Sequence, residues 1–199
     1  MVLAELKIED MLPATLTVPG LNEADFLALC EKFPDATLEY TEDGTIIIMP
    51  PTDPRSGARV AQVVRQLGNW AEEEGQGMVL GPDAGFFFPR GSRRSPDATW
   101  FDLRRFEEAE KQGLVFPVFA PEFVIEVRSR HDRLRALREK MEEYIANGVQ
   151  LGWLIDPFKR TVEIYRPGRE PELLENPPSV AGEGPVAGFV LSLERVFTA

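Results

Sequence analysis

Residues 121–148, which read PEFVIEVRSRHDRLRALREKMEEYIANG, constrain the fold more than any other stretch, because a strand pattern runs directly into a helix pattern. The strand pattern is an alternation of side chains over residues 122–128. One side is apolar (Phe123, Ile125, Val127), and the other side carries Glu122, Val124, Glu126 and Arg128. A period of two predicts a strand with one apolar face and one face of ionisable groups.

The helix pattern follows within residues 129–148. Ser129 begins an S-x-x-D sequence, which predicts a helix N-cap with Asp132 in the first turn, and Gly148 is placed to end the helix. Lys140 lies about 90° from the middle of the apolar stripe, so its ammonium can extend towards the carboxylates of the strand. The stripe consists of Leu134, Leu137, Met141, Tyr144 and Ile145.

Two interpretations of this segment are open. A strand that ends in a carboxylate, followed by a helix that returns a lysine, is one way to build a metal-dependent hydrolase site. The alternative is an edge strand with solvated charges and an ordinary surface lysine.

Composition limits the chemistry that is possible. At 199 residues, with 43% hydrophobic and 28% charged residues, the chain is long enough for one substantial domain. It has one cysteine, Cys30, and one histidine, His131, which excludes an internal disulfide, zinc sites built from those ligands and Cys–His catalysis. Any metal must therefore be held by oxygen, which favours magnesium, manganese or calcium.

Charge and hydropathy indicate the compartment and the partners. No apolar run approaches the roughly 20 residues of a membrane span, and the start MVLAELKIED carries acids where a secretory signal carries a basic residue. We therefore expect a cytoplasmic protein without a membrane partner. The net charge of −11 argues against non-specific nucleic-acid binding, yet residues 90–140 hold 12 of the 22 basic and 9 of the 33 acidic residues. A polyanion is expected to approach this middle segment, unless its arginines pair with nearby acids.

The order of elements predicts the fold class. A helix capped by Asn22 and a hairpin around Asp43-Gly44 predict a small appendage over residues 1–50. Prolines at 50, 51 and 54 mark a bend into a core of residues 51–199, and the appendage is expected to pack on it within one domain. This order predicts an α/β (α+β) fold with one mixed sheet flanked by helices.

Within the core, the patterns predict helices over residues 57–74 and 103–112, the first ended by Gly75 and Gly77. Predicted strands cover residues 78–80, 86–88, 95–101, 151–155 and 161–165. Residues 167–188, rich in proline, glycine and glutamate, are predicted to be mostly loop. Residues 189–197 are predicted to fold back as a final strand or helical turn.

Pro96-Asp97, followed by Glu126-Val127-Arg128 and then by Lys140, resembles the motif of the PD-(D/E)XK nuclease superfamily. The chain is more closely similar to the Uma family of restriction endonuclease-like proteins, in the segments SPDATWF, APEFVIEVRS, KMEEYIANGV and GWLIDPFKRTVEIY, over roughly residues 35–170. The resemblance implies a restriction endonuclease-like fold and an endonuclease that hydrolyses phosphodiester bonds in DNA. It also implies Mg²⁺ as cofactor, with Mn²⁺ as a substitute, and a homodimer.

The resemblance implies a role for each matching residue. Asp97 and Glu126 would bind the metal, with the backbone carbonyl of Val127 as a third ligand, and Lys140 would act near the scissile phosphate. Arg128 departs from the superfamily motif, which has lysine there, and arginine cannot act as a base because it stays protonated. Arg128, Arg94 and Ser129 are expected to contact a substrate phosphate.

Structural roles are expected for other polar and aromatic residues. Glu122 is expected to be peripheral, Asp102 to cap the helix that follows it, and His131 to lie on the surface. The three tryptophans, Trp70, Trp100 and Trp153, are expected in the core. Gln62 or Glu72 could complete the site, but nothing in the sequence selects either.

Two other functions compete with the nuclease. The first is a binding or regulatory protein whose nuclease site is weak or silent, which the acidic net charge and Arg128 favour. The second is a hydrolase that acts on sugars through a pair of carboxylates without metal, which leaves Lys140 with no role.

Overall fold

The computed structural model describes residues 14–18, 21–34, 36–49, 52–111, 113 and 118–199, and the chain divides into two compact units. Unit 1 takes Met1–Pro51 and Arg90–Arg94, and unit 2 takes Thr52–Pro89 and Ser95–Ala199. The second segment of unit 1 was assigned to the core by the sequence. The packing of the appendage and the core as one domain stays a prediction.

Unit 1 is an antiparallel sheet with one helix. Its strands are β1 (Ala14–Thr17), β2 (Thr37–Tyr40), β3 (Thr45–Met49) and β6 (Arg93–Arg94), in the order β1-β3-β2-β6. The predicted hairpin is confirmed, and Gly44 supplies the positive φ of its turn. Helix α1 (Glu23–Lys32) begins as predicted, because the side-chain oxygen of Asn22 accepts a hydrogen bond from Asp25 N at 3.0 Å.

Unit 2 is built on a six-stranded mixed sheet in the order β11-β10-β9-β8-β7-β4, which confirms the predicted fold class. Its strands are β4 (Gly77–Leu80), β7 (Ala98–Asp102), β8 (Phe123–Val127), β9 (Leu151–Asp156), β10 (Thr161–Tyr165) and β11 (Glu172–Glu175). Strands β8 and β9 are parallel and are joined by helix α4 (Leu134–Ala146), whereas the other neighbours pair antiparallel. The short strand β5 (Phe86–Phe87) and helix α3 (Leu103–Glu110) also belong to this unit.

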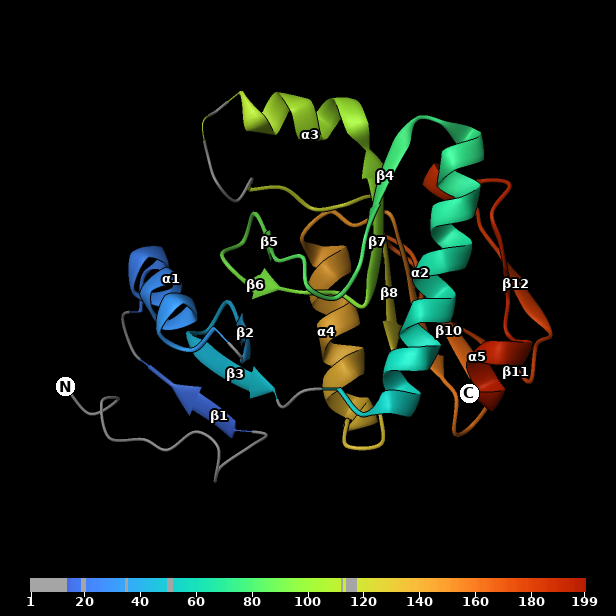
Figure 1. Ribbon diagram of the computed structural model, residues 1–199, viewed down its shortest axis with the longest axis horizontal. Coiled ribbons are helices and arrows are strands. Elements are labelled where there is room, and N and C mark those ends of the chain that lie inside the picture. The colour runs from blue at the N-terminus through green and yellow to red at the C-terminus, as the bar shows by residue number, and fades with distance from the viewer. Residues whose placement is uncertain (1–13, 19–20, 35, 50–51, 112, 114–117) are drawn as a thin grey trace. The chain divides into compact units, whose positions relative to one another are not determined.

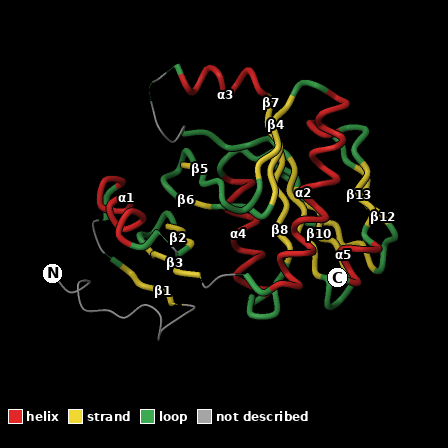
Figure 2. Tube along the Cα trace, viewed as in Figure 1, coloured by secondary structure: helices red, strands yellow, loops and turns green. Residues whose placement is uncertain are grey.

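The sheet of unit 2 lies between α2 (Pro54–Glu74) and α4 (Figures 1 and 2). The alternation of β8 explains this arrangement. Phe123, Ile125 and Val127 pack in one apolar cluster with Val63 and Leu67 of α2. Val124 packs in a second cluster, on the opposite face, with Met141 and Tyr144 of α4. All five residues of β8 are buried, so the strand is central and the edge-strand interpretation is wrong.

Helix α2 starts three residues earlier than predicted, because Asp53 caps it and Pro54 occupies its first turn. The Asp53 carboxylate accepts hydrogen bonds from Arg55 N and Ser56 N. Gly75 ends the helix with a φ of 76°, as predicted, while Pro50 and Pro51 lie outside the described residues. No helix in the described part of the chain has the length and apolar character needed to cross a bilayer.

Helix α4 starts later than predicted, at Leu134. Ser129 does not cap it. Instead, the backbone N–H of Ser129 donates to the carboxylate of Asp132 at 2.7 Å. The S-x-x-D sequence therefore forms a separate turn before the helix begins. Asn147 follows the helix and Gly148 adopts a φ of 103°, which confirms the predicted end.

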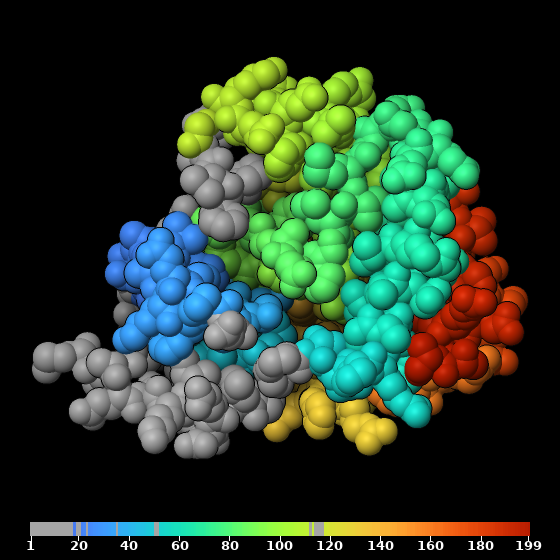
Figure 3. All heavy atoms as spheres, viewed as in Figure 1, coloured from blue at the N-terminus to red at the C-terminus, as the bar shows by residue number. Residues whose placement is uncertain are grey.

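The C-terminal segment is more ordered than a loop. Strand β11 extends the sheet, and β12 (Ser179–Ala181) pairs with β13 (Val190–Ser192). The loop prediction is therefore wrong for the residues of β11 and β12. Residues 189–197 do fold back, as β13 and helix α5 (Glu194–Thr198). Figure 3 shows this segment beside α2 on the visible face, and the Gln66 amide of α2 bonds the backbone of Ser192 in both directions.

Two glycines permit close approaches. A Cβ atom on Gly152 of β9 would lie 2.5 Å from Cε of Met141 and 3.4 Å from Cγ2 of Val124, so α4 sits directly on the sheet there. A Cβ atom on Gly77 would lie 2.0 Å from Nε1 of Trp100. Gly77 was predicted to end a helix, but it begins β4 and leaves room for the indole.

We expect the substitution Gly77→Ala to reduce the free energy of unfolding by about 1–3 kcal/mol, because a rigid buried ring must move to admit the methyl group. Urea unfolding followed by tryptophan fluorescence measures this change. The matched control is Gly57→Ala in α2, where the backbone is helical. A Cβ atom at this position would have no atom within 4 Å apart from its chain neighbours and the backbone of the helix itself. That variant should be as stable as the wild type or more stable by about 0.5–1 kcal/mol. Equal stability of Gly77→Ala and wild type would contradict the close approach.

Candidate functional site

The candidate site lies at the carboxyl end of β8, on the face that α4 covers. Because β8 sends alternate side chains to opposite faces, Glu126 points to the same side as Val124. Its side chain is 5% exposed. A carboxylate this deep requires partners, since an unpaired buried charge is strongly unfavourable.

Helix α4 supplies those partners. Lys140 Nζ lies 2.9 Å from Oε1 of Glu126, and the Tyr144 hydroxyl donates to the same oxygen at 2.7 Å. The two residues are four positions apart on the helix, so they lie one above the other on one face. Tyr144 is fully buried and Lys140 is 11% exposed, which makes this a desolvated ion pair.

Asp97 directly precedes β7 and lies beside Glu126, because β7 and β8 pair antiparallel with Ala98 opposite Ile125. Its Oδ2 accepts a hydrogen bond from Val127 N at 2.7 Å. Burial raises the pKa of Asp97 to about 8, with a further contribution from the negative charge of Glu126. The Val127 hydrogen bond and the Lys140 charge act in the opposite direction on this pKa. With a pKa of about 8, the Asp97 carboxyl is mostly protonated at neutral pH when no metal ion is bound.

The structure thus brings together the three residues that the sequence placed at the centre, Asp97, Glu126 and Lys140. They come from three segments: the start of β7, the end of β8 and the outer flank of α4. Lys140 contacts Glu126 directly, and Asp97 senses the charges of both residues, while the catalytic role of the three stays a prediction.

The donor set fits a hard divalent cation. In a strand, the N–H and C=O of one residue point to the same edge, so the Val127 carbonyl faces the Asp97 side, where its N–H bonds that carboxylate. Two carboxylates and a carbonyl offer oxygen only. A bound cation would compensate the burial of Asp97 and its repulsion from Glu126, which together raise the pKa of this carboxyl. Among the described residues no three His, Cys, Asp or Glu side chains gather as a metal-binding group. Mg²⁺ is compatible with two carboxylates, because it keeps several waters.

Arg128 forms an ion pair with a carboxylate of the neighbouring strand. Its Nη1 lies 2.8 Å from Oδ2 of Asp156, which is 3% exposed at the end of β9. Asp156 also accepts hydrogen bonds from Phe158 N and Lys159 N, so the pair fixes the turn after β9. In this arrangement the guanidinium is engaged by an internal carboxylate, and a phosphate contact for Arg128 stays a prediction.

Ser129 and Arg94, the other two expected phosphate contacts, lie in different settings. Ser129 belongs to the turn between β8 and α4, next to the site in sequence, and its backbone N–H bonds Asp132. Arg94 belongs to unit 1, is 5% exposed and pairs with Glu39 at 3.0 Å. Nothing in the structure assigns either residue to a substrate.

The expected structural roles are largely found. Glu122 is buried and binds Arg105 and the backbone N–H of Asp102, so it forms a separate ion pair. Asp102 caps α3 through Arg104 N at 2.9 Å, and His131 is exposed. Trp100 and Trp153 are buried, and Trp70 packs against them at the edge of the same core. Gln62 of α2 bonds Arg65, and Glu72 is exposed.

Sequence reasoning missed one residue that holds Glu126 in the site. Tyr144 was assigned to the apolar stripe only, although a hydroxyl four residues after Lys140 was the available signal. The pair of Arg128 with Asp156 was missed as well, because no local pattern joins two side chains that lie 28 residues apart in sequence.

Comparison with known proteins finds a family and a solved structure that are both described as nucleases. The family model Uma2, described as "Putative restriction endonuclease", matches residues 23–194. Among solved structures, a protein from Anabaena variabilis ATCC 29413, described as "a putative nuclease belonging to DUF820", is similar with a TM-score of 0.76 and 25% identity. The match covers 89% of this chain and 98% of that one. The search of the curated proteins found no match. Since the family model spans most of the sequence, this chain belongs to the Uma2 family.

Proposed function

We propose that this protein is a Mg²⁺-dependent endonuclease that hydrolyses phosphodiester bonds in DNA, with Asp97, Glu126 and Lys140 at its centre. The observation that carries the proposal is the convergence of the two acids with the Lys140 ammonium, 2.9 Å from Glu126. The family and the nuclease-like structure support the same reaction class.

Asp97, Glu126 and the Val127 carbonyl would hold the ion, and Mn²⁺ would substitute for Mg²⁺. A bound divalent ion would supply a water of lowered pKa and neutralise charge on the phosphate oxygens. Tyr144 would keep the Glu126 carboxylate in place, because it bonds one oxygen from a fully buried position. The Asp97 carboxyl would give up its proton on metal binding, since only the carboxylate is a good ligand.

Lys140 would stabilise the negative charge that develops on the phosphate. Its ammonium already contacts Glu126, and its Nζ lies 5.7 Å from the centre of the Tyr144 ring. A donor that is fixed before the reaction need not reorganise in the transition state. The sugar hydrolase alternative would leave this lysine without a function. Cleavage of both DNA strands would require two such sites, which a homodimer would provide.

A binding protein with a silent site is the second candidate. Arg128 supports it, because this residue replaces the lysine of the superfamily motif and its guanidinium pairs with Asp156. The net charge of −11 supports it as well. Both candidates would bind the metal ion, and only the nuclease would hydrolyse DNA. Metal binding and hydrolysis therefore have to be measured separately.

Metal affinity should depend steeply on pH. The raised pKa of Asp97, about 8, means that ion binding below this pH must displace one proton. The affinity for Mn²⁺ should therefore rise about tenfold per pH unit between about pH 6 and 8 and level off above. Calorimetric titration measures it.

The substitution Asp97→Asn should remove most of the affinity and its pH dependence. Asp83→Asn, which changes an exposed acid in the loop before β5, is the control and should behave as wild type. Affinity that stays constant over this pH range, or survives in Asp97→Asn, would show that Asp97 is not a ligand.

Hydrolysis should require both the acid and the lysine. In a nicking assay on supercoiled plasmid with Mg²⁺, Asp97→Ala and Lys140→Ala should each lower the rate about a hundredfold or more, because each removes a group that stabilises the transition state. Lys111→Ala removes an exposed lysine after α3 and should nick at the wild-type rate. Thermal unfolding of each variant checks that the fold is intact. Equal rates for all four proteins would reject the nuclease and leave the binding protein.

A further inference from the structure

We propose that Phe158 and Arg59, with Arg128 beside them, form a subsite that binds a single-stranded segment of nucleic acid: a base stacks on Phe158 and a phosphate bonds Arg59. This inference rests on the proposed function, because it supplies a substrate-binding surface next to the proposed active site. It also assigns a role to two residues that the hydrolytic mechanism does not use.

The first observation is an exposed aromatic ring. Phe158 follows Asp156 in the turn after β9 and is 46% exposed. The described residues include three other large apolar side chains of similar exposure, Val118, Leu173 and Val190, and none of them is aromatic. An exposed ring costs free energy in water, and a flat aromatic face is the surface on which nucleobases stack.

The second observation is an incompletely bonded buried cation. Arg59 lies in the second turn of α2, is 8% exposed, and its guanidinium carbon is 5.2 Å from the centre of the Phe158 ring. Its Nε is buried and has no hydrogen-bond partner among the described residues. A buried N–H without an acceptor is unfavourable by about 1–3 kcal/mol as a general rule. An anionic oxygen is the acceptor that would satisfy a guanidinium best.

Arg128 differs from Arg59 in its partner. Its guanidinium carbon lies 5.6 Å from the Phe158 ring centre, but its Nη1 is paired with Asp156. Arg128 is thus held by an internal carboxylate, while the Nε of Arg59 has no acceptor among the described residues. At the start of α2, hydrogen bonds from Ser56 lower the pKa of Asp53, and the positive charge of Arg59 adds a smaller effect in the same direction.

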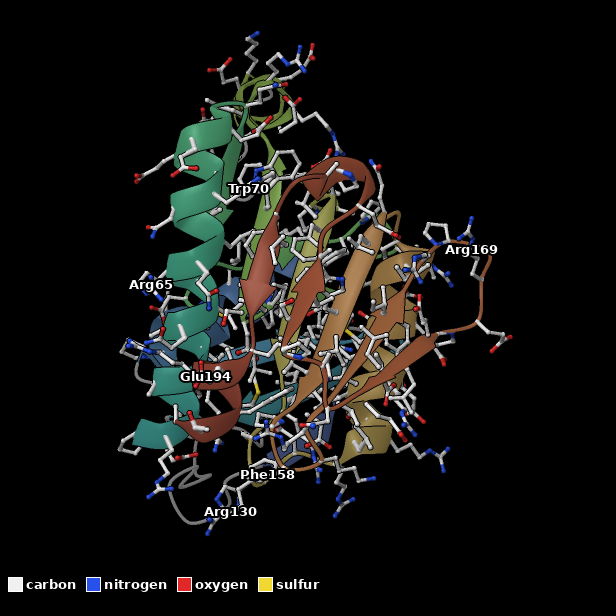
Figure 4. The ribbon with its side chains drawn as sticks, turned by 90° about the vertical axis from the view of Figure 1, so that its right-hand side faces the viewer. Arg65, Trp70, Arg130, Phe158, Arg169 and Glu194 are labelled. Atoms are coloured by element: carbon white, nitrogen blue, oxygen red, sulfur yellow. The ribbon has the colours of Figure 1, made fainter. Side chains whose placement is uncertain are left out.

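The subsite adjoins the proposed active site. Val127, the last residue of β8, pairs with Ile155 of β9. Arg128 and Asp156 follow these two residues, so the carboxyl ends of β8 and β9 lie at the same end of the sheet. In Figure 4 the labelled Phe158 and Arg130 lie together at this end, near the first turn of α2. Arg130 is exposed and adds positive charge there. The subsite and the proposed active site therefore lie at the same end of the sheet.

This chemistry defines the ligand. Every base has a π-face, so one aromatic platform gives no sequence preference, and the base must be unpaired to reach it. The competing explanation is that Phe158 serves only as a cation–π partner that stabilises the two arginines. That explanation predicts a loss of stability in Phe158→Ala and no change in nucleic-acid binding.

The test measures binding without hydrolysis. A fluorescein-labelled single strand of about 12 nucleotides is titrated with protein by fluorescence anisotropy, with Ca²⁺ as the divalent ion and a gel to check that the strand is intact. Phe158→Ala should weaken binding about fivefold or more, and Phe158→Tyr should stay within about twofold of wild type. Arg59→Lys keeps the charge but loses the planar donor set, and should also weaken binding. Leu173→Ala, which removes another exposed apolar side chain, is the matched control and should bind as wild type.

A second readout reports the stack itself. A strand that carries 2-aminopurine should lose fluorescence on binding the wild type and keep it with Phe158→Ala. Equal affinity and equal quenching for both proteins would overturn this inference alone, whatever the plasmid assay gives. Binding that depends on Phe158, without nicking, would support the subsite and reject the nuclease. A wild type that binds no single strand would also overturn the subsite, and the plasmid assay would then decide separately on the nuclease.

Discussion

One buried carboxylate organises this structure. Glu126 lies near the centre of the larger sheet, and α4 supplies both a cation and a hydroxyl to a single oxygen of its side chain. Breaking such a pair by removing one partner costs about 3–5 kcal/mol in other proteins, because it leaves a buried charge without compensation. The pair therefore fixes the position of α4 on the sheet as well as the chemistry of the site. Asp97, which lies beside Glu126 without an equivalent cation, keeps its proton instead.

The alternation of β8 separates stability from chemistry. Its apolar residues face α2 and the C-terminal segment, where they join the large aromatic and aliphatic core. Its polar end faces α4, where the candidate site is built. The second face couples packing to the position of Lys140, because both belong to α4. This division explains how one strand of five residues serves both purposes.

The sequence predicted the features that depend on local periodicity and on motif order. The two faces of β8, the stripe of α4 and the caps at Asn22 and Asp102 follow from spacing alone, and Asp97, Glu126 and Lys140 follow from the motif. Features that depend on tertiary pairing were missed. Strand β11 reads as loop because ELLE has no strand pattern, and it forms by pairing with β10. The Ser129 turn replaced the expected cap, since its N–H meets the Asp132 carboxylate before the helix starts.

Gly152 shows how such a site can be altered from a distance. It bears no functional group, and its neighbours are the apolar Met141 and Val124. The absence of a side chain there sets the thickness of the layer between β9 and the helix that carries the lysine. A larger residue at this position would push α4 away from β9. The Lys140 ammonium would then move away from the acids, although every polar group would still be present. Loss of activity in a relative with an intact set of charged residues could therefore originate at this spacer position.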